Sequence, residues 1–248
     1  MKRLNKAFTL TELLVALGVI GVLCAILLPI IFNIMPSQNT IMAKRAYYIV
    51  QSVVSDLIND EACYPDLTNA SSSEQRKGFD DGYGYPNCDK WGGTENTYTT
   101  NHDNAEPNAN LKFATLFTDK LDLSGSVSPS ATGTTFTTKD GIQWAIHNMG
   151  YGTKNDKDAS AIITVDVNGK NSPNCDQAAG NGGASYSSYI SGYESCNGRV
   201  KGFDRFSMYV YADGRITIYD PDVWAINAVQ VDRNITGDGT QNSNDDKL

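Results

Sequence analysis

Basic residues are few in this sequence of 248 residues. Twenty lysines and arginines stand against 28 aspartates and glutamates, which gives a formal net charge of -8 and a pI near 4.7. An acidic surface repels phosphate backbones, so nucleic-acid binding is not favoured. Only two histidines occur, His102 and His147, and the sequence contains no Gly-x-Ser-x-Gly segment and no phosphate-binding loop. Without a catalytic constellation, we expect that the protein is not an enzyme.

Charge is missing from one long stretch near the N-terminus. Leu13 to Phe32 is 20 residues without a charged side chain. At about 1.5 Å per residue it would form roughly 30 Å of helix, close to the hydrocarbon thickness of a bilayer. Basic residues precede it at Lys2, Arg3 and Lys6. The positive-inside rule therefore predicts a membrane-spanning helix with its N-terminus in the cytoplasm and the bulk of the chain exported.

Other N-terminal signals fit this stretch poorly. A secretory signal peptide has an apolar stretch of about 7–15 residues and a small-x-small cleavage site soon after it, and neither is present. A lipoprotein signal needs a small residue before its cysteine, whereas Leu23 precedes Cys24. An uncleaved anchor gives no role to Glu12, which lies at the front edge of the run. A carboxylate in a membrane helix costs a few kcal/mol and is a functional candidate by default.

The segment KAFTLTELLVAL, which ends at Leu17, resembles the N-terminal signature of type IV pilins and type II secretion pseudopilins. In that family a short basic leader is removed on the cytoplasmic side, the new N-terminal residue is N-methylated, and a glutamate five positions into the mature chain helps subunits to dock into a filament. The resemblance implies cleavage between Ala7 and Phe8, N-methylation of Phe8, and an assembly role for Glu12. The new α-amino group is the nearest partner for the Glu12 carboxylate, within one chain or between neighbours. Pro29 falls where many members carry a helix-disturbing proline.

Two positions depart from the family pattern. Ala7 stands where glycine is usual, and Thr11 stands where an aliphatic residue is common. The resemblance also implies the partners: further copies of the chain, a prepilin peptidase and methylase, the pilus or secretion assembly machinery, and the membrane. It places the chain in the inner (cytoplasmic) membrane as a single-pass protein before assembly. After assembly the chain would belong to an extracytoplasmic or cell-surface filament.

Cysteine usage agrees with export. Apart from Cys24 in the apolar run, four cysteines remain, an even number that suggests two disulfides. Four cysteines allow three pairings, and we favour Cys63–Cys88 and Cys175–Cys196, because each pair closes a local loop rich in Gly, Asn and Ser. Each bridge would stabilise the fold by about 3–4 kcal/mol in the chain-entropy model. Zinc binding is less favoured, since no Cys-x-x-Cys pair exists.

The rest of the chain changes from helical to strand patterns. Ile41 to Asn59 carries an apolar stripe at helical spacing, and residues 61–109 are loop-like. Asn110 to Leu121 predicts a short helix, and Asp220 to Val229 a last one. Five short β-branched or aromatic segments predict strands: TTFTT, GIQWAIHN, SAIITVDV, FSMYVYA and RITIY. Asp213-Gly214, between the last two, is a hairpin signal.

These elements predict an α+β fold. A long N-terminal helix, half membrane-spanning and half amphipathic, would pack on an antiparallel β-sheet head, the arrangement for which pilin-like proteins are known. The predicted division is a leader at 1–7, a transmembrane assembly helix at 8–34, its amphipathic continuation at 35–60, a globular head at 61–232 and a flexible tail at 233–248. No cofactor is required by this scheme.

One segment of the head offers ligands for a metal ion. Asp166, Asn168, Asn174 and Asp204, with Asn171, supply oxygens around a glycine turn directly after a strand, and Ca²⁺ prefers such oxygens. The spacing is not that of an EF-hand, and a turn capped by Asx side chains would need no metal. Some pseudopilins similarly hold Ca²⁺ in a loop near the sheet. A second segment, residues 232–239, lacks the closing acid of a calcium loop.

The sequence therefore favours a structural subunit that is cleaved, methylated and polymerised into a type IV pilus or a type II secretion pseudopilus. A minor or tip subunit that acts as an adhesive or substrate-binding module is the alternative. The aromatic residues of the head could form such a binding surface or simply the sheet core. A membrane-anchored enzyme is a remote third hypothesis. The sequence leaves open which filament system is served and what the head contacts.

Overall fold

The computed structural model describes residues 10–34, 37–67, 69, 78–79, 83–91, 97–98, 111–130, 133–148, 159–178, 186–194, 196 and 202–233. The side chains of residues 26–34, 83–84, 97–98, 148, 159–160, 187 and 231–233 lie outside this description. The chain divides into two compact units, residues 1–37 and residues 38–248. Ala7, Phe8, His102 and the predicted tail from residue 234 onward fall outside the described residues.

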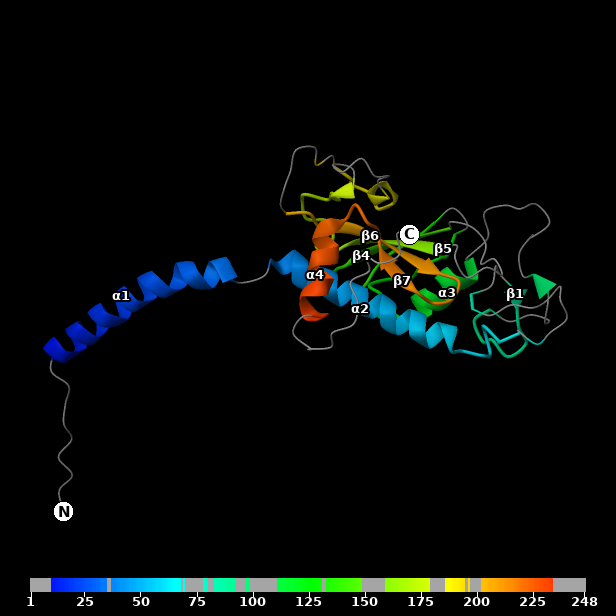
Figure 1. Cartoon of the computed structure of the whole chain (residues 1–248), viewed down its shortest axis with the longest axis horizontal. Helices are drawn as coiled ribbons and strands as arrows, with labels where there is room; N and C mark the ends of the chain where they lie inside the picture. Colours follow the sequence, from blue (N-terminus) through cyan, green and yellow to red (C-terminus); the bar gives the residue numbers. More distant parts are fainter. Residues whose placement is uncertain are drawn as a thin grey trace, which may run out of the picture. The chain divides into compact units, whose positions relative to one another are not determined.

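The N-terminal unit contains the helix α1, Leu10–Ile34 (Figure 1). Glu12 lies in its first turn, where the helix dipole favours a carboxylate. Pro29 lies within the helical range, but its side chain is outside the description, so the predicted kink stays a prediction. The predicted span from Leu13 to Phe32 is likewise described with side chains only in part. Among the described residues, none of the helices combines the length and the apolar character that crossing a membrane requires.

The predicted long helix is divided into two helices. α1 ends at Ile34, and α2, Gln38–Ile58, begins the second unit. Pro36 lies between them in the sequence, and proline lacks a backbone donor and disfavours the helical conformation in the residue before it. Ser37 directly precedes α2, and serine is among the residues preferred at a helix N-cap.

A five-stranded antiparallel sheet forms the centre of the second unit. Its strands are β3 (Thr134–Thr137), β4 (Gln143–Asn148), β5 (Ala159–Asp166), β6 (Arg205–Tyr211) and β7 (Ile216–Ile218), and they neighbour one another in chain order. All five predicted strands are confirmed. The predicted hairpin joins β6 to β7, where Gly214 takes a φ of +84° that residues with a side chain rarely adopt. A separate pair, β1 (Tyr83–Gly84) and β2 (Thr97–Tyr98), is also antiparallel.

The hydrophobic core lies between one face of the sheet and the helices. α2 contributes the stripe Ala46, Val50, Val53 and Leu57, all buried, and α3 (Leu111–Asp119) adds Phe113 and Phe117. α4 (Val223–Arg233) contacts α2, and Figure 1 shows both helices beside the sheet. The sheet residues of this core alternate along their strands, as period-two geometry requires: Trp144, Ile146, Ile163, Val165, Phe206, Met208 and Val210. The predicted α+β arrangement is confirmed.

The opposite face of the sheet is covered by the long connection between β5 and β6. This connection includes the 3-10 turn η3, Ser187–Tyr189, which contacts both strands. The Thr164 hydroxyl on β5 lies 3.5 Å from the Tyr186 carbonyl oxygen and 3.0 Å from the Ser207 hydroxyl on β6. Both predicted disulfides are present: Cys63–Cys88 ties the end of α2 to the following loop, and Cys175–Cys196 closes part of the β5–β6 connection.

Candidate functional site

Helix α1 presents apolar side chains on all sides. Its large apolar residues between Leu10 and Leu23 are exposed by 51% to 80%. They are Leu10, Leu13, Leu14, Val15, Leu17, Val19, Ile20, Val22 and Leu23. An added Cβ at Gly18 or Gly21 would meet nothing within 4 Å. A helix that is apolar all round is stable when lipid or other protein surrounds it, and within its own unit α1 has no such cover among the described residues.

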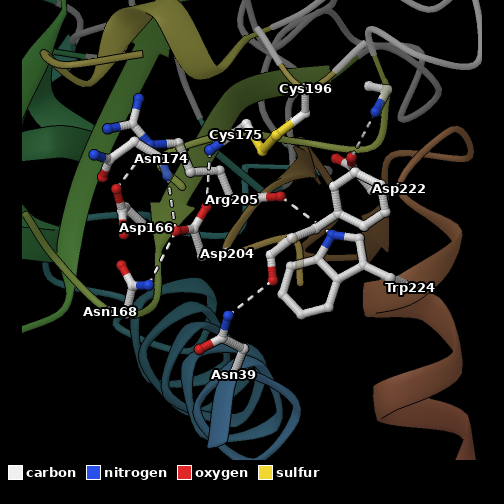
Figure 2. The surroundings of a disulfide bond; sticks show 12 residues. Asn39, Asp166, Asn168, Asn174, Cys175, Cys196, Asp204, Arg205, Asp222 and Trp224 are labelled. Atoms are coloured by element: carbon white, nitrogen blue, oxygen red, sulfur yellow. Dashed lines mark hydrogen bonds and ion pairs between the residues drawn. A yellow bond between two sulfur atoms is a disulfide. The ribbon is translucent and has the colours of Figure 1, made fainter. Parts of the chain in front are cut away.

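In the head, the predicted ligand residues come together around the Cys175–Cys196 disulfide (Figure 2). Both oxygens of the buried Asp204 carboxylate accept hydrogen bonds from nitrogen donors. The Asn174 backbone N–H and the Asn168 side-chain amide donate to Oδ2 at 2.8 and 3.0 Å, and the Cys175 backbone N–H donates to Oδ1 at 2.8 Å. Asp204 therefore holds the loop through two backbone donors and one side-chain donor that are distant from it in the sequence.

Asp166 is paired with a cation from its own chain. The Arg205 Nε atom donates to the Asp166 Oδ2 atom at 2.7 Å, and both side chains are fully buried. The remaining Arg205 nitrogens donate to the carbonyl oxygens of Ile190 and Ser191, each at 2.9 Å. One guanidinium therefore fixes a carboxylate on β5 and two carbonyls at the end of η3. Each of its three nitrogens donates at least one hydrogen bond, which compensates for the burial of the charge.

The Asn174 side chain lies among oxygens. Turned one way, its amide nitrogen donates to Asp166 Oδ2 at 3.2 Å and to the carbonyl oxygens of Gly169 and Asn171 at 3.1 Å each. Turned the other way, its amide oxygen faces the same three oxygens. Asp166 Oδ1 and Asn168 Oδ1 are also buried and have no hydrogen-bond partner among the described residues. Such a group of oxygens suits either an amide N–H₂ or a small hard cation.

Burial shifts the titration of the head carboxylates. Desolvation raises the pKa of Asp166 to about 6, although the Arg205 hydrogen bond opposes the shift. Desolvation also raises the pKa of Asp204, against the Cys175 and Asn174 backbone donors. The pKa of Asp222, the residue before α4, rises to about 7, chiefly through burial. Asp222 accepts backbone hydrogen bonds from Ala178 at 3.2 Å and Ser207 at 2.9 Å, which ties α4 to the disulfide loop.

His147 lies on the covered face of the sheet. It is 4% exposed, and neither ring nitrogen has a hydrogen-bond partner among the described residues. Its ring contacts the Tyr189 ring with a centroid separation of 3.3 Å. Burial lowers the pKa of His147 to about 4, so the imidazole is neutral at pH 7. The His147 ring packs against Tyr189 on the covered face of the sheet.

The N-terminal segment is the part of the chain that matches a known family model. Residues 2–28 match the family model described as the prokaryotic N-terminal methylation motif. At its N-terminus the chain carries the prepilin-type cleavage and methylation motif of the type IV pilin and pseudopilin family. Comparison with curated proteins and comparison with solved structures each found no match. The motif implies processing by a prepilin peptidase and assembly into pilus-like filaments, and it indicates a structural protein.

The matched range contains every residue predicted for processing and assembly in this prepilin-type chain. Ala7 and Phe8 lie within residues 2–28 but outside the described residues, and Glu12 lies in the first turn of α1. In the head, the structure brings together Asp166, Asn168, Asn174 and Asp204, as predicted. Whether they hold a metal stays a prediction. No group of three or more His, Cys, Asp or Glu side chains in the described part of the chain is arranged to bind a metal.

Sequence reasoning missed four buried charged residues of the head: Lys112, Asp176, Arg205 and Asp222. Arg205 and Asp222 organise the disulfide loop, and only the apolar neighbours that flank them in the sequence hinted at their burial. Lys112, on α3, is fully buried, with its Nζ atom 4.2 Å from the Tyr64 ring centroid and 4.7 Å from that of Tyr85. The position of Lys112 next to Phe113 in an amphipathic pattern gave no signal that two tyrosines from a distant loop would surround it.

Proposed function

We propose that this chain is a filament subunit of a type IV pilus or a type II secretion pseudopilus. It is inserted in the cytoplasmic membrane with its N-terminus inside, cleaved between Ala7 and Phe8, and methylated on Phe8. It then polymerises through α1. The observation that carries the proposal is the joint occurrence of the matched methylation motif and a helix whose apolar side chains are exposed on every side.

The chemistry of assembly follows from the charge at Glu12. A carboxylate near the end of an apolar helix is stabilised when a cation lies close to it in a medium of low dielectric constant. Cleavage before Phe8 creates an α-amino group four residues from Glu12 in the sequence. In a bundle of α1 helices, the amine of one copy neutralises the Glu12 carboxylate of a neighbour. The charge pair then favours one register between copies.

Filament yield in cells tests this function. We expect that Glu12→Ala and Glu12→Gln each reduce sheared filament at least tenfold while the processed chain remains in the membrane. Glu61→Ala, which removes an exposed glutamate in the turn after α2, is the matched control and should assemble normally. Normal filament yield with Glu12→Ala would contradict the proposal. The ratio of this chain to the other subunits in purified filaments separates a major subunit from a minor or tip subunit.

The oxygen cluster of the head supports a second proposal, a Ca²⁺ ion in the loop after β5. Asp166, the Asn174 amide oxygen and the carbonyls of Gly169 and Asn171 would hold it. Asn168 Oδ1 is a further oxygen without a partner among the described residues. Arg205 donates to the same Asp166 carboxylate and so competes with a cation there. Asp204, whose two oxygens accept nitrogen donors, would position the loop without binding the ion.

Replacing Asn174 distinguishes a Ca²⁺ ion bound among these oxygens from an Asn174 amide group that donates hydrogen bonds to them. With Ca²⁺ in the loop, the thermal midpoint of the full chain in detergent should be higher in 1 mM Ca²⁺ than in EGTA. Asn174→Asp should then increase this difference, because it adds a negative ligand. Without a cation, Asn174→Asp places a second carboxylate against Asp166, which lowers the midpoint in both solutions. No difference between Ca²⁺ and EGTA in the unmodified chain would reject the calcium proposal.

A further inference from the structure

A polar pocket lies on the outer face of the head, between the edge of the sheet and η3. Its polar lining comes from Thr135 and Thr137 on β3, Gln143 on β4, and Tyr189 and Ser191 at η3. The cavity volume is about 260 Å³, slightly below the roughly 300–1,000 Å³ that is typical of small-molecule sites. Phe136, Trp144 and Ile190 complete the lining. The pocket therefore has room for a ligand of about one ring.

The polar side chains of this pocket are not engaged by the protein. Among the described residues, the side chains of Thr135, Thr137, Gln143, Tyr189 and Ser191 make no hydrogen bond. Together they offer four hydroxyl groups and one carboxamide, which both donate and accept. No lining residue in the described chain is charged. Such a set of groups suits a neutral ligand with many hydroxyls and gives no compensation to an ion.

Tyr189 supplies a flat apolar surface beside these groups. Its side chain remains 49% exposed, although its ring contacts His147 from the sheet side. A tyrosine ring held on one side and open on the other can stack against the C–H face of a sugar ring while polar neighbours bind the hydroxyls. The combination of one aromatic face and several uncharged hydrogen-bonding groups suits amphipathic ligands of this kind.

The wall formed by η3 is held in place before any ligand arrives. Arg205 donates to the Ile190 and Ser191 carbonyl oxygens while it is paired with Asp166, and all of these contacts are at 2.9 Å or less. A pre-ordered wall reduces the loss of conformational freedom on binding. The buried pair thus has a consequence at the surface, because it anchors the two residues that directly follow Tyr189.

A second hollow adjoins the first along the edge strand. It shares Thr135, Phe136 and Thr137 with the pocket and has a volume of about 290 Å³. The other side of this hollow is formed by the segment from Ser124 to Val127, which again carries no charge. Two adjoining uncharged hollows that share residues of β3 offer space for two consecutive residues of an oligosaccharide.

We propose that the pocket between β3, β4 and η3 binds a neutral sugar residue of a glycan. Tyr189 stacks on the sugar ring, and Gln143, Thr135, Thr137 and Ser191 bind its hydroxyls. The adjoining hollow receives the next residue of the glycan. This inference does not rest on filament assembly, since every residue that carries it lies in the head.

Saturation-transfer NMR on the full chain in detergent tests the proposal. The neutral probes are methyl glucoside, methyl galactoside, N-acetylglucosamine and the disaccharides lactose and maltose. Glucuronate and glucosamine are charged probes of the same size. We expect saturation transfer to at least one neutral probe and weaker transfer to its charged counterparts. The disaccharide of the preferred sugar should bind more tightly than the single residue.

Three variants connect the binding to this pocket. Tyr189→Ala and Gln143→Ala should each raise the dissociation constant of the preferred neutral sugar at least tenfold. Thr135→Val, which removes one hydroxyl at an exposed position, should raise this dissociation constant several-fold without affecting folding. Tyr48→Ala is the matched control, because Tyr48 is 46% exposed on α2 and does not line the pocket. Absence of transfer to every neutral probe overturns the proposal. So does binding that survives in Gln143→Ala and Thr135→Val, or equal binding of the charged sugars.

Discussion

The Arg205 guanidinium lies 2.7 Å from the Asp166 carboxylate, and both side chains are completely buried. The two residues face each other across neighbouring strands, where Asp166 on β5 is paired in register with Arg205 on β6. The same guanidinium binds the Ile190 and Ser191 carbonyls. This pair therefore connects the sheet to the disulfide loop that covers its outer face.

Removing the cation of this pair should destabilise the head strongly. Arg205→Met leaves a buried carboxylate and two carbonyl oxygens without donors, at a cost of about 3–5 kcal/mol. Urea unfolding of the full chain in detergent, followed by tryptophan fluorescence, measures the free energy of unfolding. Arg215→Met is the control: Arg215 is exposed and pairs with Asp213, so its loss should cost at most about 1 kcal/mol. Equal losses of unfolding free energy in the two variants would show that the buried pair stabilises the head no more than an exposed pair does.

Asp222 should make the stability of the head fall as the pH rises. Its folded-state pKa is about 7, whereas the ordinary value is 3.8, so the folded chain binds this proton more tightly than the unfolded chain. Its stabilising contribution is complete below about pH 4 and is lost as the pH rises to about 7, by at most about 4 kcal/mol. Asp222→Asn should therefore flatten the dependence of the unfolding free energy on pH between 5 and 8. A profile parallel to that of the unmodified chain would disprove this role.

His147 should make the stability of the head fall as the pH falls, the opposite of the effect of Asp222. Burial lowers its pKa to about 4, so the folded chain binds this proton less tightly than the unfolded chain does. Its contribution is complete above about pH 6.5 and is lost as the pH falls toward 4. His147→Phe, which keeps an aromatic ring against Tyr189, should raise the thermal midpoint at pH 5 relative to pH 8 when compared with the unmodified chain. The same midpoint difference in both chains would contradict the burial of a neutral histidine.

The β5–β6 connection should stay ordered without its disulfide. Replacing Cys175 and Cys196 by serine should cost about 3 kcal/mol through the unfolded chain. The Asn174 and Cys175 amides, which donate to Asp204 at 2.8 Å each, should nevertheless remain protected in hydrogen exchange. Asp204→Ala, with the disulfide intact, should lose that protection. If protection is lost without the disulfide but kept in Asp204→Ala, then the disulfide, and not Asp204, orders this connection.

Processing should respond to the residue at the cleavage site. Ala7 occupies the position where glycine is usual in the family that the chain resembles at its N-terminus. Ala7→Gly should therefore increase the rate at which the leader is removed, which pulse labelling followed by electrophoresis resolves. Asn5→Gly, two residues upstream, serves as the control and should leave the rate unchanged. A slower rate with Ala7→Gly would place the cleavage elsewhere.

The sequence predicted the strands and the disulfides because their determinants are local. Each strand shows β-branched and aromatic residues between turn residues, and each cysteine pair closes its own loop of 21 or 25 residues. The helix stripe Ala46, Val50 and Leu57 was likewise visible as a period of 3.6. Trp144 and Phe206 were predicted only as strand residues, and alternation along their strands then places both in the core.

The buried polar network was not predictable in the same way. Asp204 accepts donors that lie about 30 residues away in the chain, and Arg205 donates to carbonyls 14 and 15 residues away. Such contacts depend on how a loop folds back over a sheet, which no local pattern encodes. The end of α1 at Ile34 is different: Pro36 follows it in the sequence and cannot donate a helical hydrogen bond, yet the sequence analysis predicted one long helix through this point.

The mature N-terminus is the most direct test of the assembly claim. Filaments should be sheared from cells, digested and examined by mass spectrometry for the peptide that contains Glu12. The account predicts that the chain begins at Phe8, carries one methyl group on its α-amino nitrogen and lacks the leader Met1–Ala7. A chain in the filament that still begins at Met1, or the absence of this chain from filaments, would contradict it.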